Sequence, residues 1–123
     1  MRALASFAAA LALVGCAVAG SGGGSESPAS LRYRPGFAYY SDEYTLEGDV
    51  YRLGEEKNLE EVYQYYAYFE AVHDERQRVV IFKAYVRGDL DWTERYRYDR
   101  NGWLVEKELI RPGQAGEVTR FDR

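Results

Sequence analysis

Residues 98–105, Tyr98-Asp99-Arg100-Asn101-Gly102-Trp103-Leu104-Val105, decide the fold, because a tight-turn sequence leads there directly into an apolar, β-prone run. The same pattern occurs 25 residues earlier, as His73-Asp74-Glu75-Arg76-Gln77-Arg78-Val79-Val80. Each copy has an aromatic ring, an aspartate, a short polar turn and an apolar run, which is the chemistry of a β-hairpin. The repeat therefore predicts successive hairpins in the second half of the chain.

This repeat assigns particular residues to the turns. Asp74 and Asp99 can accept hydrogen bonds from turn amides, and Asn101 and Gly102 tolerate a positive φ. Near the C-terminus, Phe121-Asp122 repeats the aromatic ring and the aspartate once more. We therefore expect Asp74, Asp99, Asn101 and Gly102 to have structural roles in turns.

Between the turns, the residue types favour strands. Residues 79–87 are rich in β-branched and aromatic side chains, and Arg87-Gly88-Asp89-Leu90 can reverse the chain after them. Further strands are expected at residues 92–98, 103–110 and 117–122, with residues 37–40 and 50–53 as additional candidates. We predict a mostly β fold, a single small antiparallel β-meander sheet.

The copy at residues 98–105 resembles the YD repeats of bacterial Rhs-type cell-surface proteins, in which Tyr-Asp and a polar glycine turn join antiparallel strands. The first copy departs from this pattern, because His73 replaces the tyrosine and Gln77 replaces the turn glycine. The resemblance covers roughly residues 63–122 and implies a meander of hairpins. Family members that form large closed shells use many repeats, so this short chain is not expected to form one.

Residues 58–72 admit two interpretations. In a helix, Asn58 would cap the first turn, and Glu60 and Glu61 would suit its positive N-terminal end. A helix at about 59–72 covering the sheet would make the fold α+β. In a strand, alternate residues would face opposite sides of the sheet. Four tyrosines favour the strand: Tyr63, Tyr65, Tyr66 and Tyr68.

Composition restricts the class of function. Residues 31–123 give room for one small domain and contain all twelve tyrosines. Loss of Arg2 with a signal peptide would change the formal net charge from −4 to −5. An acidic chain without a basic tail argues against nucleic-acid binding, which needs clustered positive charge. It also gives little overall attraction to anionic lipid headgroups.

The N-terminal residues indicate where the protein resides. Leu13-Val14-Gly15-Cys16 ends an apolar run that begins at Ala3, and Cys16 is the only cysteine of the chain. With Arg2 ahead of that run, residues 1–15 have the parts of a secretory signal. The motif resembles the lipobox of bacterial lipoproteins. That resemblance implies cleavage before the cysteine and attachment there of a diacylglyceryl group and an N-acyl chain such as palmitate.

The segment admits two other interpretations. A transmembrane helix needs roughly 20 apolar residues, and small and polar residues take over after Ala19. Plain secretion would use a cleavage site at Ala17-Val18-Ala19. Lipidation of Cys16 explains the lone cysteine better than either, because one cysteine cannot form an internal disulfide.

The resemblance to lipoproteins also suggests a membrane. In that family an aspartate after the cysteine commonly marks inner-membrane retention, whereas this chain has Ala17. We therefore expect anchoring to the outer membrane, on the periplasmic side rather than the cell surface. Residues 21–30 are rich in glycine and serine and are expected to be a flexible tether. The expected organisation is a signal peptide at 1–15, a lipidated cysteine and tether at 16–30, and a β-meander domain at 31–123.

One face of the predicted sheet is a candidate binding surface. Alternation puts Phe82, Trp92, Tyr96 and Tyr98 on the other face. The candidate face would carry Tyr66, Tyr68, Lys83, Tyr85, Arg95 and Arg97. Tyrosine and arginine are enriched where proteins bind partners. The alternative is an ordinary solvent-exposed face, and an exposed sheet edge is a second candidate for docking.

Patterns of catalysis are weak in this sequence. His73 stands at a predicted turn without a nucleophile at recognisable spacing. Asp89, Asp91 and Glu94 do not match a calcium loop, and the acidic pairs Glu55-Glu56 and Glu60-Glu61 are more typical of solvated charge than of a glycosidase. No phosphate-binding loop or Cys/His metal motif is present in the sequence. We therefore predict no catalytic residues, no metal and no cofactor.

The sequence thus favours a non-catalytic binding or accessory module anchored to the membrane through lipid on Cys16. Its expected partner is an envelope protein or a cell-wall polymer, not nucleic acid. One alternative is an immunity-type protein against a surface toxin, suggested by the resemblance to YD repeats. A small cell-envelope hydrolase is the other, and it would need a concave site with convergent acids.

Overall fold

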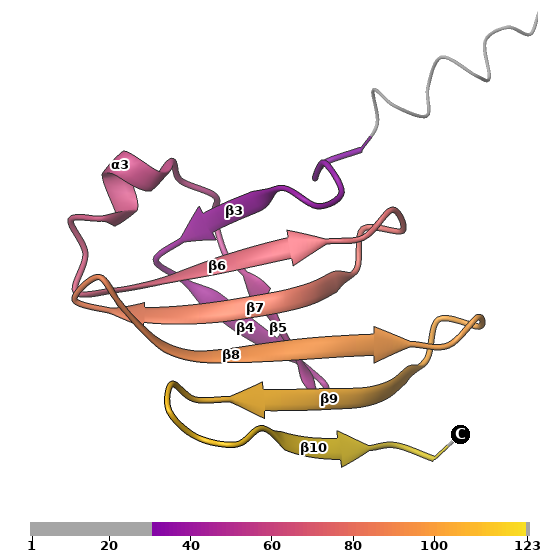
Figure 1. The fold of residues 1–123 in the computed structure, drawn as a ribbon. Helices are drawn as coiled ribbons and strands as arrows, with labels where there is room; N and C mark the ends of the chain where they lie inside the picture. The colour runs from indigo at the N-terminus through magenta and orange to yellow at the C-terminus, as the bar shows by residue number, and fades with distance from the viewer. Residues whose placement is uncertain (1–30, 123) are drawn as a thin grey trace, which may run out of the picture. The chain divides into compact units, whose positions relative to one another are not determined.

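We describe residues 31–122 of a computed structural model (Figure 1). The predicted signal peptide, the lipidation site Cys16 and the predicted tether lie outside the described residues. Tyr33–Arg123 form a compact unit of their own. Within the described part of the chain, no helix has the length and apolar character needed to cross a membrane.

The main feature of this unit is a six-stranded sheet with the order β10-β9-β8-β7-β6-β3. All neighbouring strands in it are antiparallel. The strands are β3 (Ala38–Ser41), β6 (Ala67–His73), β7 (Val79–Val86), β8 (Asp89–Tyr98), β9 (Leu104–Ile110) and β10 (Glu117–Arg120). Because β6 to β10 follow one another both along the chain and across the sheet, the predicted mostly β fold with an antiparallel meander is confirmed.

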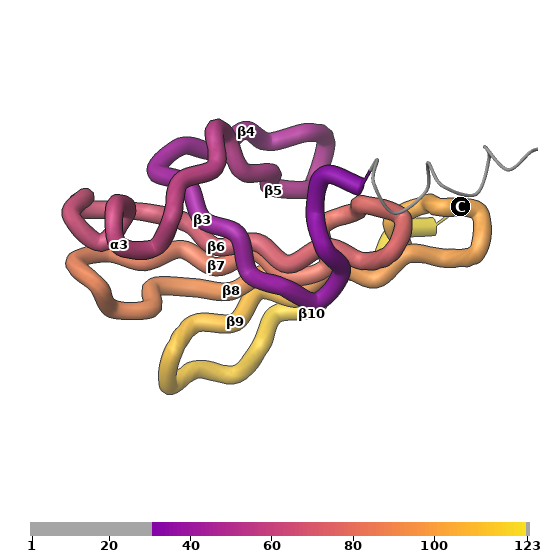
Figure 2. Tube along the Cα trace, turned by 90° about the horizontal axis from the view of Figure 1, so that it is seen from above, coloured from indigo at the N-terminus to yellow at the C-terminus, as the bar shows by residue number. Residues whose placement is uncertain are grey.

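A separate hairpin covers one face of this sheet. It consists of β4 (Tyr44–Glu47) and β5 (Val50–Leu53), and Figure 2 shows it to one side of the six strands. The Tyr51 ring stacks on Phe82, with ring centroids 5.3 Å apart, and lies 5.0 Å from the Trp92 ring. The core between the two layers contains Ala71, Val79, Phe82, Tyr96 and Leu104. The expected strand at 50–53 is confirmed, whereas its partner β4 and the second sheet were not predicted.

Residues 58–72 combine parts of both interpretations. Asn58 caps α3 (Leu59–Val62), and its side chain accepts a hydrogen bond from the Glu61 amide at 2.8 Å. The helix ends after one turn, so the alternative of a helix at 59–72 covering the sheet is wrong. The strand interpretation is wrong for residues 63–66, which lie between α3 and β6, and right from Ala67 onward. Asn58 and the acidic first turn stabilise a helix start, and the chain then becomes a strand only where Ala67–His73 pair with β7.

The two repeated turns have the same hydrogen-bond geometry. Oδ1 of Asp74 accepts from the amides of Arg76 and Arg78, both at 2.9 Å. Oδ1 of Asp99 accepts from the amides of Asn101 and Trp103 at 2.9 and 3.0 Å. The predicted roles of both aspartates in the turns are therefore confirmed.

A positive φ occurs at the same position of each turn. It is 91° at Gly102 and 67° at Gln77, whereas Asn101 has a negative φ. A side chain at such a φ is strained. Two hydrogen bonds offset this strain. The side-chain amide of Gln77 accepts from the Tyr33 backbone N–H at 2.9 Å and donates to the Tyr33 carbonyl at 2.8 Å, which clamps the Tyr33 backbone. This clamp explains why glutamine stands where the other copy has glycine.

Candidate functional site

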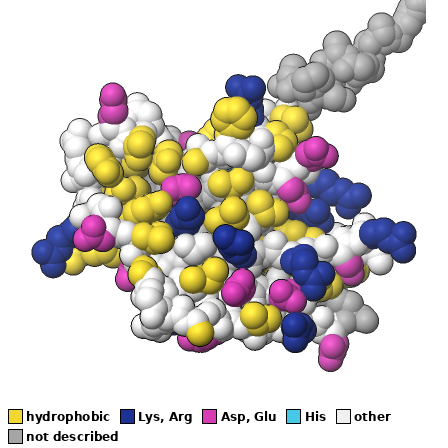
Figure 3. Space-filling model, viewed as in Figure 1, with side chains coloured by type: hydrophobic (Ala, Val, Ile, Leu, Met, Phe, Trp, Pro, Cys, Tyr) yellow, Lys and Arg dark blue, Asp and Glu magenta, His cyan; other side chains and the backbone are white. Residues whose placement is uncertain are grey.

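The face of the sheet opposite the β4–β5 hairpin carries the predicted binding residues, and we call it the open face. Cross-strand pairs share a face, and the register pairs Lys83 with Glu70 and Thr93, and Arg97 with Glu106. Lys83, Tyr85, Arg95 and Arg97 therefore lie on one face, as expected. Figure 3 shows this face, with hydrophobic side chains gathered at the end near α3 and basic side chains more frequent toward the other end.

At the α3 end, the open face carries a cluster of tyrosines. The Tyr68 and Tyr85 rings stack with centroids 4.9 Å apart, and the Tyr63 ring packs edge-on against Tyr68 at 5.9 Å. Tyr68 is only 2% exposed, so its predicted role in direct contact with a partner is wrong. Its neighbours cover it, and the exposed rings are Tyr63 and Tyr66, each 65% exposed.

Tyr85 is held in place by a carboxylate. Its hydroxyl donates to Oε1 of Glu70 at 2.9 Å. Burial, together with this hydrogen bond and the charge of Glu70, raises the pKa of Tyr85 far above its ordinary value. Burial and Glu70 also raise the pKa of Tyr40. These hydroxyls stay protonated at neutral pH, so the cluster supplies apolar area and hydrogen-bond donors, not a base.

The middle and far side of the open face are basic. Arg97 and Arg120 share one carboxylate, Glu106, at 3.1 and 3.3 Å. The hydrogen bond from Arg97 and the two neighbouring charges lower the pKa of Glu106. Within residues 31–122, Lys83 and Arg95 have no carboxylate within ion-pair distance. In the strand register Glu70 stands opposite Lys83 and Glu108 opposite Arg95, without forming an ion pair with them.

A shallow cavity of about 350 Å³ lies at the edge of the tyrosine cluster. It is lined by Tyr63 and by the β7–β8 turn: Arg87, Gly88 and Asp89. Arg87 and Gly88 both have positive φ, 51° and 82°, which is the backbone of a type I′ hairpin. The Arg87 guanidinium lies 5.6 Å from the centroid of the Tyr66 ring. This cavity extends the open face beyond the residues that the sequence pattern indicated.

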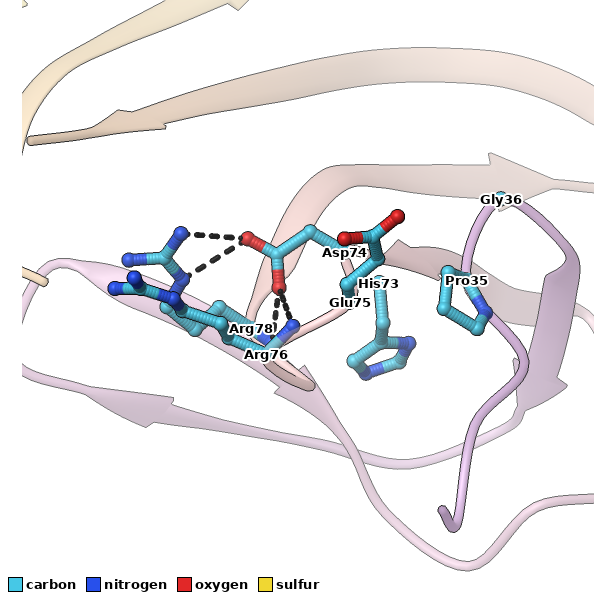
Figure 4. Close-up of a pocket in the computed structure, with 7 residues that line it drawn as sticks. All are labelled: Pro35, Gly36, His73, Asp74, Glu75, Arg76 and Arg78. Carbon is cyan, nitrogen blue, oxygen red and sulfur yellow. Dashed lines mark hydrogen bonds and ion pairs between the residues drawn. The ribbon is translucent and has the colours of Figure 1, made fainter. Parts of the chain in front are cut away.

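A second cavity, of about 400 Å³, lies at the opposite end of the sheet (Figure 4). It is lined by Pro35, Gly36, His73, Asp74, Glu75, Arg76 and Arg78. His73 is 2% exposed, and its ring lies parallel to that of Tyr33 at 3.7 Å. Asp74 binds the Arg78 guanidinium at 2.8 Å. Burial alone would raise the pKa of Asp74, but the hydrogen bonds from the Arg78 amide and guanidinium hold it below its ordinary value.

The lining of this second cavity does not form a catalytic set. His73 packs as part of an aromatic stack, and the neighbouring acid, Asp74, is occupied by turn amides and by Arg78. Among the described residues that line the cavity there is neither a serine nor a cysteine. The described lining thus stabilises the β6–β7 turn and places no nucleophilic side chain next to His73.

The acidic residues that the sequence offered as candidates for a calcium site or a glycosidase site are dispersed. Glu94 is buried on the covered face, where it accepts a hydrogen bond from Tyr96 at 2.6 Å, while Asp89 and Asp91 are exposed near a turn. Glu55 pairs with Lys57 at 3.7 Å, and Glu56 accepts from the Tyr33 hydroxyl at 2.7 Å. Among the described residues, no group of three or more metal-binding side chains comes together.

The sequence pattern did not predict the place of three residues on the open face. Strand alternation puts Tyr63 on the face opposite Tyr66 and Tyr68, Arg87 belongs to a predicted turn, and the sequence pattern gives no face for Arg120. Tyr63 and Arg87 stand beside the strands and not within them, so a period of two cannot place them. The pairing of Arg120 with Glu106 depends on the register of β10 on β9, for which the sequence carries no evident signal.

The chain belongs to a family of unknown function, DUF6156, whose profile matches residues 50–123. The match includes β5 and all of the meander from β6 to β10. A search of curated proteins and a search of solved structures each found no match.

Proposed function

We propose that this protein is a lipid-anchored envelope lipoprotein whose folded unit is a non-catalytic binding module, and that a protein partner docks on the open face. The observation that carries the proposal is the difference between the two faces of the sheet. The β4–β5 hairpin closes one face over a core, whereas on the other face Tyr63 and Tyr66 are 65% exposed. Lys83 and Arg95 lie on the same face and form no ion pair with a carboxylate among the described residues.

The dimensions of the open face favour a protein partner. Five spacings between the six strands, and the seven residue pairs between β6 and β7, make it roughly 24 Å by 23 Å at its widest. That area is of the order of one side of a standard protein–protein interface, about 800 Å² with side-chain relief included. Its exposed tyrosines can fill pockets in a partner, while Lys83 and Arg95 can meet carboxylates. A partner with an acidic rim around an apolar centre fits this arrangement.

The anchoring part of the proposal depends on Leu13-Val14-Gly15-Cys16. Two or more acyl chains on Cys16 would hold the protein at the membrane, because a single chain gives only marginal binding. The tether would let the folded unit move near that surface while it meets its partner. Outer-membrane anchoring on the periplasmic side remains part of this proposal.

Copurification from cells tests the role of the open face. We expect a partner to copurify with the wild-type protein from gently solubilised envelopes. The pair Lys83→Glu and Arg95→Glu should reduce its yield at least about tenfold, since each reversal removes an attraction and adds a repulsion. Thr45→Glu, on the exposed strand β4 of the covering hairpin, is the matched control and should leave the yield unchanged. Equal recovery with all three proteins, each verified as folded by circular dichroism, would contradict docking on the open face. Recovery of a glycan in place of a protein would also contradict it.

A further inference from the structure

We propose that one end of the folded unit rests on the anionic phospholipid surface to which the protein is anchored. We call it the turn end, because it contains the β6–β7 and β8–β9 turns. Its exposed members are Arg34, Phe37, Arg76, Arg100 and Trp103. This inference rests on the proposed lipid anchor and adds to it an orientation of the fold on the membrane.

The chain joins the folded unit at this end. Gln77 clamps the Tyr33 backbone with two hydrogen bonds of 2.9 and 2.8 Å, and the Gly36 amide donates to the His73 carbonyl at 3.0 Å. The start of the unit is thus fixed to the β6–β7 turn. Cys16 lies 17 residues before Tyr33, which corresponds to a root-mean-square span of about 23 Å for a flexible chain. A lipid on Cys16 would therefore attach the unit to the membrane through the turn end.

The charges of the turn end suit an anionic surface. Arg76 donates to the Arg100 carbonyl at 3.3 Å, which joins the two turns side by side, as Figure 1 shows. Both arginines are exposed. The acids Asp74 and Asp99 are engaged with turn amides and, for Asp74, with Arg78.

Charge alone gives this end a small attraction. Among the exposed charges, Arg34, Arg76 and Arg100 stand against Glu75 and Asp122, an excess of one positive charge; the half-buried Arg78, Asp74 and Asp99 offset this excess. Aromatic side chains add a second contribution. Trp103 is 56% exposed and Phe37 is 53% exposed, with the Arg34 guanidinium 4.4 Å above the Phe37 ring. Tryptophan is favoured at the membrane–water interface, and arginine is attracted to anionic headgroups.

The opposite end of the sheet lacks this combination. Glu60 and Glu61 lie in the first turn of α3, and Asp89 and Asp91 follow Arg87 at the start of β8. An anionic surface would repel those carboxylates. The distribution of charge therefore favours the turn end over the opposite end for contact with an anionic surface, although the chain as a whole is acidic.

A weak contact with lipid is sufficient to orient a unit that is already tethered to the membrane. A short flexible tether holds the turn end at an effective concentration in the millimolar range, so a millimolar affinity for lipid already orients the unit. The exposed Tyr63 and Tyr66 lie at the other end and would then point away from the membrane. This orientation presents the tyrosine cluster of the open face to a partner.

Fluorescence of Trp103 tests the orientation. The chain from Cys16 to Arg123 retains the whole compact unit, and its single thiol can be coupled to a maleimide lipid in vesicles of phosphatidylcholine with or without phosphatidylglycerol. We expect acrylamide quenching of Trp103 to fall about twofold in the anionic vesicles, because the interface excludes the quencher. High salt should reverse the protection. The variant Trp103→Phe gives the background from Trp92.

Charge reversals provide the decisive comparison. Arg76→Glu combined with Arg100→Glu should abolish the protection of Trp103, whereas Arg87→Glu at the opposite end should leave it unchanged. Equal quenching of the wild-type protein in both kinds of vesicle would overturn the proposal, and so would equal protection in the double variant. Because the thiol coupling supplies the attachment, this result does not depend on lipidation in cells. Failure of the proposed function would instead appear as a mature protein without lipid on Cys16, or as a partner indifferent to Lys83 and Arg95.

Discussion

Tyr96→Phe should destabilise the protein strongly, because the Tyr96 hydroxyl joins the sheet to the hairpin that covers it. The residue is 5% exposed. Its hydroxyl donates to Oε1 of Glu94 at 2.6 Å and accepts from the Tyr51 amide of β5 at 3.1 Å. Burial, and then the hydrogen bond to Glu94, raise the pKa of Tyr96 far above its ordinary value. Phenylalanine keeps the ring in the core and removes only these two hydrogen bonds.

The size of the effect follows from the groups that lose a partner. A hydrogen bond to a carboxylate contributes about 1.5–3 kcal/mol, and leaving the partly buried Tyr51 amide without its partner costs about 1–3 kcal/mol. We therefore expect the free energy of unfolding to fall by about 3–5 kcal/mol. The control is Tyr98→Phe, which removes one hydrogen bond to the Val79 carbonyl, 2.7 Å long, and should cost about 0.5–1.5 kcal/mol.

Urea denaturation of the chain from Cys16 to Arg123, followed by circular dichroism, measures both variants. Thermal unfolding should agree, with Tm lower by at least about 12 °C for Tyr96→Phe, since 1 kcal/mol shifts Tm by roughly 4–8 °C in a unit of this size. If Tyr96→Phe and Tyr98→Phe had equal effects, the hydroxyl of Tyr96 would not be what holds the hairpin on the sheet, and the reasoning would be refuted.

The remaining predictions concern the turns and the anchor. Gly102→Val should destabilise the fold by roughly 1–3 kcal/mol, because φ is 91° there; an unchanged Tm would refute this, and Gly102→Asn should cost less. The lowered pKa of Asp74 means that its contribution to stability is present above the unfolded-state pKa of about 3.9 and is lost as pH falls through the lower folded-state value. The difference in stability between the wild-type protein and Asp74→Asn should therefore be constant from neutral pH to about pH 4 and decrease below it. A difference that increased in acid would mean that folding raises the pKa of Asp74 instead of lowering it. Cys16→Ser should give a protein without lipid that keeps its signal peptide, and a lipid-free, membrane-bound mature form on mass spectrometry would count against the lipobox.

The fold was predictable where local chemistry and alternation agree. The two Asp-centred turns and the strands between them carry strong local signals, so their order across the sheet follows. The covering hairpin was half predicted, because β5 has an apolar pattern while all four residues of β4 are exposed. The helix at 59–62 was foreseeable from the Asn58 cap, but its length was not. The extended chain starts at Ala67 because the pairing of β6 with β7 begins at that residue.

The candidate site was predictable only in its central part. Lys83, Tyr85, Arg95 and Arg97 share a face because strand residues alternate with a period of two. The burial of Tyr68 depends on Tyr63 and Tyr85 stacking around it, which is a tertiary effect. The positive φ of Gln77 is likewise explained by its distant partner Tyr33. Neither contact has a signal in neighbouring residues.

Site-specific photocrosslinking in cells tests the central claim, docking of a protein on the open face, most directly. A photoreactive residue replaces Tyr66 or Arg95, which are exposed on or beside the open face, or Thr45 on the covering hairpin. We predict that the first two positions capture the same envelope protein and that Thr45 does not. Capture of that protein at Thr45 alone, or equally at all three positions, would contradict docking on the open face.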